Sequence, residues 1–330
     1  MRRYRWLAGL TMMGLLLMYP QPAVEGAQAA MYLWYKNVAP SLFPFMALMP
    51  LITCADAMRA YEALLGGVMR GLFDLPGAAA PAFFTGMVAG SPAGAIAVRR
   101  VAARGGMNAG EARRLAGAVC GLSPAFLLSS VGAGMLGSIH YGRILAGAQL
   151  TAQILTAVLL RLLWKGKRFE ERAERDDDPD VSARGPVQAI LSVCGYMAFF
   201  GALARVARHL LGKTAGDAIL CALDMPSGAK LISELPCPVE TKVLVIAAMA
   251  GFGGVCVLAQ NIGALGQASI GVPELLFARL LSAALTALSA FVFIHIPDLH
   301  ALSAFRYGVL GMAALVIPIL VMIKCRGVNN

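Results

Sequence analysis

The stretch GMVAGSPAGAIAVRR, residues 86–100, decides the predicted fold, because turn-forming residues interrupt it where a membrane-spanning helix would otherwise continue. The apolar residues 78–89 before the break would form about 18 Å of helix at 1.5 Å per residue, which crosses only about half of a bilayer. We therefore predict a re-entrant hairpin over residues 77–98, whose two arms enter and leave on the same side. At its tip, Ser91 can cap the second arm and Pro92 can take its first position, where no amide donor is needed.

The composition places most of the chain in a membrane. Of the 330 residues, 58% are hydrophobic and 14% are charged, and the mean hydropathy is +0.70, which excludes a soluble globular protein. Apolar stretches that approach the roughly 20 residues needed to cross the hydrocarbon lie near residues 6–20, 38–55, 115–137, 144–163, 187–211, 243–262, 274–296 and 305–323. We predict an all-α, polytopic membrane protein with about eight transmembrane helices plus two re-entrant hairpins.

The net charge of +10 comes from basic residues gathered in short segments between apolar runs, where they orient a membrane protein; we expect no nucleic-acid partner. Two clusters are expected in the cytoplasm: Arg99, Arg100, Arg104, Arg113 and Arg114, and Lys165, Lys167, Arg168, Arg172 and Arg175. This orientation predicts cytoplasmic N- and C-termini, but it leaves Arg205, Arg208 and Lys213 outside, against the rule. Residues 1–29 fit either a retained first helix or a cleaved signal peptide.

The second half of the chain repeats the pattern of the first. LDMPSGAKLI at 223–232 resembles VAGSPAGAIAV at 88–98, with Gly228 in the place of Gly94. A break follows each hairpin, within CGLSPAF (120–126) and GFGGVCV (251–257). An odd number of crossings in each unit predicts that the two units are inverted relative to each other, which is typical of secondary transporters.

These patterns divide the chain into two repeats and three flanking segments. We expect an N-terminal helix and outer loop over 1–37, a first repeat over 38–164, a charged cytoplasmic linker over 165–186, a second repeat over 187–296 with a re-entrant hairpin near 215–236, and a C-terminal helix over 297–330. The linker is polar with mixed charge signs, which is typical of a solvated connection.

The two breaks at membrane depth predict a binding site. Non-helical backbone in hydrocarbon leaves amide and carbonyl groups unpaired unless protein or a water-filled cavity satisfies them. Half-helices starting at Ser91, Ser123 and Ser227 would aim amide donors and a partial positive charge at such a cavity, which suits a small anion or a carboxylate. The alternative is that glycine and proline only let helices pack closely.

Two charged residues near the second tip have alternative interpretations. Lys230 could hold an anionic substrate, or it could pair with Glu234 four residues later. Asp224 could bind a proton or a coupling cation, or it could cap the second arm of its hairpin.

Polar residues in apolar helices are also ambiguous. Gln260 and Asn261 could contact substrate or bond to a neighbouring helix, and Ser129 and Ser130 are expected to bond back to their own helix. The predicted substrate site consists of Ser91, Gly94, Ser123, Ser227, Gly228, Lys230, Gln260 and Asn261, with Asp224 as the ion-coupling candidate.

Known enzyme patterns are absent or incomplete in this sequence. SGAK at 227–230 lacks the partner motifs of a serine–lysine nucleophile, and GAGMLG at 132–137 follows no predicted strand. The four histidines lie far apart and the seven cysteines are scattered singly, so we expect neither a metal site nor a disulfide framework. We therefore expect no enzyme, no catalytic residue and no cofactor, and transport that is ion-coupled, passive or powered by another subunit.

Several motifs resemble one family in the same order. They are VAPSLFPFMALMPLI (38–52), GVMRGLFDLPG (67–77), GMVAGSPAGA (86–95), SGAKLI (227–232) and GFGGVCVLAQ (251–260). Over roughly residues 30–296 the chain resembles the sporulation integral membrane protein YlbJ (SpoVV) family, which is related to nucleoside-recognition Gate-domain membrane proteins. The resemblance implies movement of dipicolinic acid across the outer forespore membrane during endospore formation.

Three functions remain open from the sequence. The first is a transporter of a small anionic metabolite, with dipicolinic acid as the substrate that the resemblance implies. The second is a permease for nucleosides or another small metabolite, and the third is a structural membrane component of spore assembly. The expected partners are the lipid bilayer and a small anionic substrate, and the sequence is also compatible with a homo-oligomer.

Overall fold

The computed structural model describes residues 5–164, 185–266 and 271–296, and these residues form helices without strands. The chain is an all-α polytopic membrane protein. Within the described residues, four helical segments are long and apolar enough to cross a membrane: Ile139–Leu163, Gly185–Leu211, Val239–Leu265 and Val272–His295. Two bent helix pairs raise the number to at most six. The predicted count of about eight is not confirmed, and one of the predicted stretches, 305–323, lies outside the described residues.

The N-terminal region is helical where the sequence suggests an outer loop. Helix α1 (Arg5–Met18) meets α2 (Pro20–Leu33) at a bend of 101°, and α2 continues through the π-helical segment η2 (Trp34–Val38) into α3 (Ala39–Ile52). Pro20 lies in the first turn of α2, where its missing amide donor costs nothing. The small residues of α2 then pack tightly on α9, since a Cβ on Gly26 would lie within 2.6 Å of the Arg205 Cβ.

The first predicted hairpin is formed by two short helices. Helix α4 (Ala55–Val68) and η3 (Met69–Phe73) turn through 97° into η4 (Gly77–Ala79) and α5 (Ala80–Ala89), and α6 (Ala93–Ala103) returns after the tip at residues 90–92. A Cβ on Gly94 would lie 2.8 Å from both the Gly86 Cα and the Val119 carbonyl oxygen. The arms therefore approach each other through glycine backbone.

A broken helix follows this hairpin. Helix α7 (Ala109–Val119) begins with a capping box between Asn108 and Glu111 and ends at the CGLSP break. The chain then forms the apolar π-helical segment η5 (Phe126–Met135) and the long helix α8 (Ile139–Leu163).

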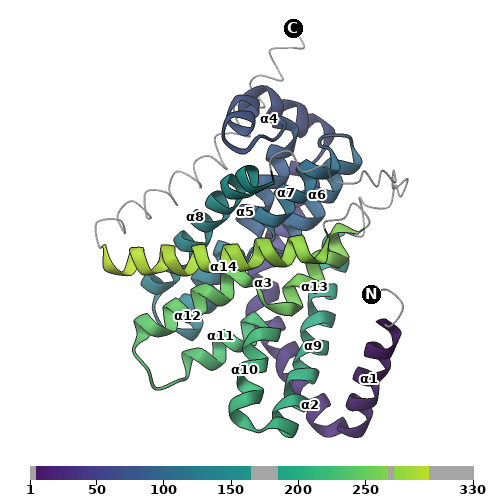
Figure 1. Cartoon of the computed structure of the whole chain (residues 1–330), viewed down its shortest axis with the longest axis vertical. Coiled ribbons are helices and arrows are strands. Elements are labelled where there is room, and N and C mark those ends of the chain that lie inside the picture. The colour runs from purple at the N-terminus through teal and green to yellow at the C-terminus, as the bar shows by residue number, and fades with distance from the viewer. Residues whose placement is uncertain (1–4, 165–184, 267–270, 297–330) are drawn as a thin grey trace.

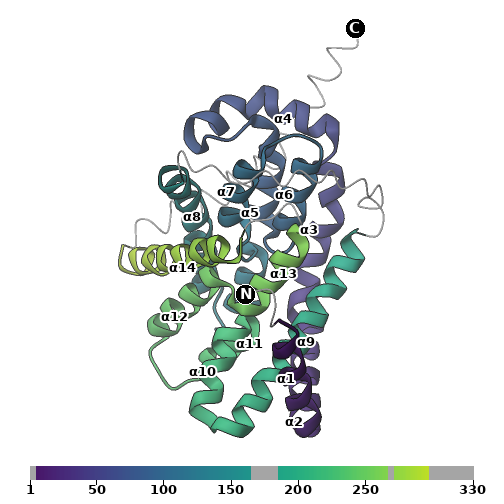
Figure 2. The same cartoon turned by 45° about the vertical axis from the view of Figure 1, so that its right-hand side comes forward.

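The second half has the same order of elements, except that it has no counterpart of α4, η3 and η4. Helix α9 (Gly185–Leu211) leads to the second hairpin, α10 (Lys213–Leu223) and α11 (Met225–Ser233), and then to α12 (Val239–Phe252), α13 (Gly254–Leu265) and α14 (Val272–His295). Figures 1 and 2 show α5 and α6 in the upper half of the molecule and α10 and α11 in the lower half, so the two hairpins lie toward opposite ends of its long axis. Helix α14 runs across that axis.

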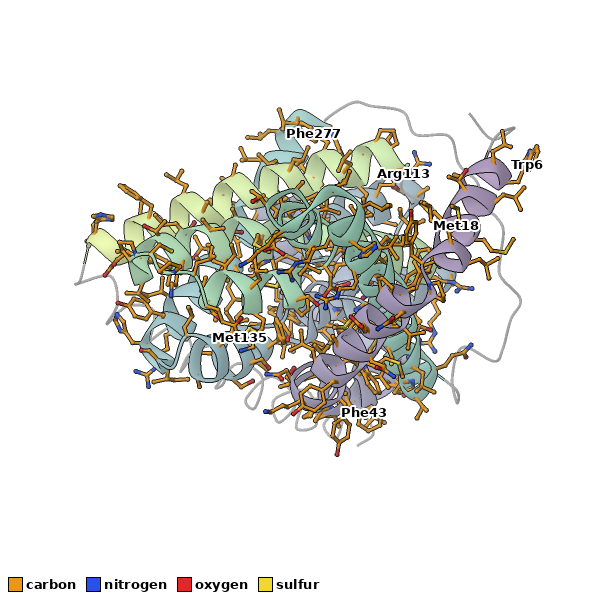
Figure 3. The ribbon with its side chains drawn as sticks, turned by 90° about the horizontal axis from the view of Figure 1, so that it is seen from below. Trp6, Met18, Phe43, Arg113, Met135 and Phe277 are labelled. Carbon is orange, nitrogen blue, oxygen red and sulfur yellow. The ribbon has the colours of Figure 1, made fainter. Side chains whose placement is uncertain are left out.

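The outer surface of the described chain is apolar. Large side chains such as Leu17 (73% exposed), Leu51 (70%) and Leu288 (60%) face outward, and Figure 3 shows Trp6, Phe43 and Phe277 at the periphery. An apolar exterior over a core that holds buried polar residues is the arrangement expected in lipid.

Candidate functional site

The tips of the two hairpins and the two helix breaks line one small central cavity of about 30 Å³. Its polar lining consists of Ser91 from the first tip, Ser123 from the first break, Asp224 from the second tip and Gln260 from α13. Apolar side chains such as Met197 complete it. This volume accommodates about one or two water molecules, so the cavity is too small for any larger molecule.

Ser91 ties the first tip to two other segments. Its hydroxyl donates to Asn261 Oδ1 at 2.6 Å, and its amide donates to the Gly121 carbonyl at 2.6 Å. The Asn261 amide group donates in turn to the Cys120 carbonyl at 3.3 Å. These bonds, which we call the Ser91 latch, satisfy backbone groups that the first break exposes.

The latch corrects the predicted role of Ser91. Ser91 does not cap α6, because its hydroxyl is committed to Asn261 and Pro92 occupies the position before the helix. Asn261 bonds to neighbouring segments, as the second interpretation of that residue predicts.

The serines of the first break divide between caps and tertiary contacts. Ser123 Oγ accepts from the Phe126 amide at 3.2 Å, so it caps the segment that follows. Ser129 donates to the Ala125 carbonyl within its own helix, as predicted. The same prediction for Ser130 is wrong, because its hydroxyl donates to the Asn37 carbonyl of η2 at 2.9 Å.

The second tip carries its own anion. Asp224 is fully buried, and its Oδ2 accepts from the Ser227 amide at 3.1 Å and from the Ser227 hydroxyl at 2.5 Å. Helix α11 therefore begins at Met225 with Asp224 as its cap, and the predicted start at Ser227 is two residues late. The Ser227 amide, which was expected to face a foreign anion, is therefore occupied by this carboxylate.

The matched glycines serve packing. A Cβ on Gly228 would lie 2.8 Å from the Cys221 Cα of the opposite arm, just as one on Gly94 would meet Gly86. Neither glycine lines the central cavity. The close-packing interpretation therefore describes both positions in this structure.

Lys230 points away from the tip. Its Nζ lies 2.5 Å from Glu234 Oε1, and the two side chains are 53% and 63% exposed. The structure thus contains the ion pair between residues four apart that the sequence offers as an alternative.

Helix α9 passes three cavities in succession. Residues 185–196 of α9 line the first, of about 390 Å³. Val193 and Met197 line the central cavity. Residues 201–208 line the third, of about 530 Å³. The central cavity therefore lies between two larger ones.

Both larger cavities have basic linings. The first, the Arg99 cavity, has Arg99 and Arg100 among the described residues that line it, and none of those described residues is acidic. The other, the Arg205 cavity, is lined by Lys36, Arg205, Arg208 and Lys230, together with Glu25, Ser227 and other residues. Ion pairs join Arg205 to Glu25 at 3.1 Å and Arg208 to Asp217 at 3.2 Å. The two arginines that contradict the predicted orientation thus line a cavity and pair with acids.

The sequence analysis missed a polar cluster behind the two breaks. Arg279 of α14 is fully buried and donates to the Gly251 carbonyl at the end of α12 at 2.7 Å. Gln149 and Gln153 of α8 are fully buried and face Gly121. A cation suits the C-terminal end of α12, where carbonyls lack partners. An arginine inside the apolar stretch 274–296 was the available signal.

Among the described residues, no group of three or more histidine, cysteine, aspartate or glutamate side chains could hold a metal ion. The described cysteines are free thiols, and Cys120 and Cys256 are buried.

Comparison with known proteins finds a relative among sporulation proteins. The chain is 26% identical over 309 aligned residues to the sporulation integral membrane protein YlbJ of Bacillus subtilis (strain 168), and the match covers 80% of this chain and 75% of the relative. No protein-family model and no solved structure matches the chain. The match supports membership of the YlbJ family and confirms the resemblance predicted from the motifs.

Proposed function

We propose that this chain, a member of the YlbJ family of sporulation integral membrane proteins, transports a small anionic metabolite, and that the metabolite is dipicolinic acid during endospore formation. The observation that carries the proposal is the arrangement along α9, where two helix-hairpin tips close a central cavity between two larger basic cavities. Broken helices that meet at a central site are the usual construction of secondary transporters.

The basic linings favour an anion. Cavities lined by one sign of charge raise the local concentration of the opposite charge. The Arg99 cavity contains two arginines among its described lining residues. In the Arg205 cavity, the arginines bind carboxylates of the protein itself, and a substrate carboxylate can exchange with them. Dipicolinate carries two carboxylates on one ring, so it suits a paired set of cationic side chains.

The volumes fit a transport cycle. The outer cavities, of about 390 and 530 Å³, are in the size range of small-molecule sites. The central cavity of about 30 Å³ excludes a dicarboxylate. Passage of the substrate therefore requires the two hairpin tips to separate. While the tips are together, the central cavity prevents a continuous channel between the two larger cavities.

The test is labelled dipicolinate uptake by the full chain reconstituted in liposomes. We expect saturable uptake that excess unlabelled dipicolinate inhibits and a nucleoside does not. Inhibition by nucleosides instead would favour the permease. Absence of uptake for both substrates by protein that remains monodisperse would favour a structural role in spore assembly and overturn the proposal.

The cellular test is deletion of the gene in a spore-forming host. We expect spores low in dipicolinate while the mother cell still makes it, and a tagged copy in the outer forespore membrane. Normal dipicolinate in the spores would contradict the assignment.

A further inference from the structure

Asp224 brings a carboxylate that has no ion-pair partner among the described residues to the central cavity. It is fully buried, its Oδ1 has no hydrogen-bond partner, and no lysine, arginine or histidine of the described chain forms an ion pair with it. Burying an ionised carboxylate is costly unless it is paired. Ionisable groups of this kind inside a membrane protein usually belong to ion or proton pathways.

The groups closest to Asp224 carry no positive charge that would neutralise its carboxylate. The thiol of Cys256 on α13 interacts with the carboxylate, and Cys221 lies on α10 one turn before Asp224. The backbone around Asp224 packs on the start of α13, since a Cβ on Gly254 would lie 2.9 Å from the Leu223 carbonyl oxygen. Arg279 of α14 binds the Gly251 carbonyl at the other side of the α12–α13 break. The segment η5 contributes no titratable side chain.

The more distant charges are engaged elsewhere. Asp217 of α10 pairs with Arg208 of α9, and Lys230 of α11 pairs with Glu234. Lys36 of η2 lies over the ring of Tyr32 at 5.7 Å. In α2, Glu25 pairs with Arg205. These groups belong to the Arg205 cavity or its edge, whereas Asp224 lines the central cavity.

The lining of the central cavity favours a proton over a metal cation. Hard cations in proteins take roughly six oxygen ligands. Among the described residues, Ser91, Ser123 and Gln260 are the only ones besides Asp224 that bring polar side chains to this cavity, and the Ser91 hydroxyl is committed to Asn261. A proton needs one oxygen, and Asp224 Oδ1 provides it.

We propose that Asp224 binds a proton at Oδ1 and that this proton is transported together with the anion. An ionised Asp224 repels an anion at the tip of the second hairpin, whereas a protonated Asp224 admits it. The proton then leaves with the substrate when the site opens to the other side. This inference rests on the proposed function and names its coupling ion.

The experiment separates coupling from transport. The full-length chain is reconstituted in liposomes, and the membrane potential is clamped at zero. Uptake of labelled dipicolinate is then measured, with protein-free liposomes as the background. One arm applies an inside-alkaline pH gradient, and the other applies no gradient but unlabelled dipicolinate inside, so that only exchange is measured. With one proton per anion, a gradient of one pH unit supports about tenfold accumulation.

We expect Asp224→Asn to lose gradient-driven accumulation and to retain exchange. Asp56→Asn is the matched control, because Asp56 is an exposed partner of Arg59 on α4, and it should behave as the wild type. Asp224→Glu keeps the carboxyl group and should retain part of the accumulation. Accumulation by Asp224→Asn equal to that of the wild type would overturn the inference, as would accumulation in the wild type that follows a sodium gradient instead of the pH gradient.

A second readout does not depend on the substrate. Infrared difference spectra between acidic and alkaline pH should contain a protonated carboxyl band in the wild type that is missing in Asp224→Asn. Absence of this difference overturns the inference even where the variant does not transport. If the wild type shows no exchange, dipicolinate is not the substrate. The infrared band would still decide whether Asp224 binds a proton.

Discussion

The two hairpins differ although their sequences follow the same pattern. Nearly all of α5 is buried, and the first tip is neutral and held by the Ser91 latch. In α10, by contrast, Gly216 is the buried residue, and the second tip carries the carboxylate of Asp224. The first hairpin is therefore built as a fixed support and the second as the part with ionisable chemistry.

This difference indicates which hairpin moves. Separating a segment from its surroundings costs free energy in proportion to the apolar surface that becomes exposed. The first hairpin packs buried side chains on both arms, whereas the second is buried mainly around Met225 and Ala229. We expect opening of the central cavity to displace α10 and α11 and to leave α5 and α6 in place.

The prediction with an all-or-none outcome concerns the first hairpin. Single cysteines at Pro76 and Arg99, in a chain whose native cysteines are replaced, should both react with an impermeant maleimide added from the same side. A re-entrant hairpin returns to its starting face, whereas a spanning segment does not. Labelling from opposite faces would remove the basis for two inverted units.

The next largest effect is expected from a large side chain between the arms. In Gly94→Leu the new Cβ meets two backbone atoms at 2.8 Å, on α5 and α7, and neither can move without moving a helix. We expect almost no monodisperse protein on size-exclusion chromatography in detergent. Gly67→Leu is the control, because nothing lies within 4 Å of a Cβ at that exposed position. Similar yields of the two variants would contradict a fixed first hairpin.

The hairpins could be predicted because their signals are local. Glycine, proline and serine set backbone geometry within a few residues, so the breaks at residues 90–92 and 120–123 can be read from the sequence. The helix over residues 20–38 was missed because propensity competes with tertiary packing, and its small residues match a groove on α9 that the local sequence does not contain.

The predicted site was harder to resolve because its contacts are not local. Asn261 lies 170 residues from Ser91, and no local pattern predicts that the two would meet. From sequence, the cap of α11 could be placed at either Asp224 or Ser227; in the structure the Asp224 carboxylate accepts from the Ser227 amide and is the cap. The untested assignments of substrate contact to Gln260 and Ser123 stay predictions, and both residues line the central cavity.

A smaller effect on stability is expected when the latch is cut. Asn261→Ala leaves the buried Ser91 hydroxyl and the Cys120 carbonyl without these partners, which costs about 1–3 kcal/mol. The matching change at the second tip, Ser227→Ala, removes the hydroxyl bond to Asp224 Oδ2 and leaves the bond from the backbone amide in place, so it should cost about 1 kcal/mol. Thermal unfolding in detergent measures both. An equal or larger loss for Ser227→Ala would show that the second tip is held as firmly as the first.

The smallest effect is expected at Lys230. Its ion pair with Glu234 is more than half exposed, and exposed pairs contribute about 0–1 kcal/mol, so Lys230→Ala should leave the midpoint of thermal unfolding almost unchanged. Because Lys230 adds positive charge to the Arg205 cavity, we expect a modest rise in the KM for dipicolinate and an unchanged maximal rate. Complete loss of uptake with normal stability would instead place Lys230 in direct contact with the substrate, and the second hairpin would then provide the anion site as well as the proton site.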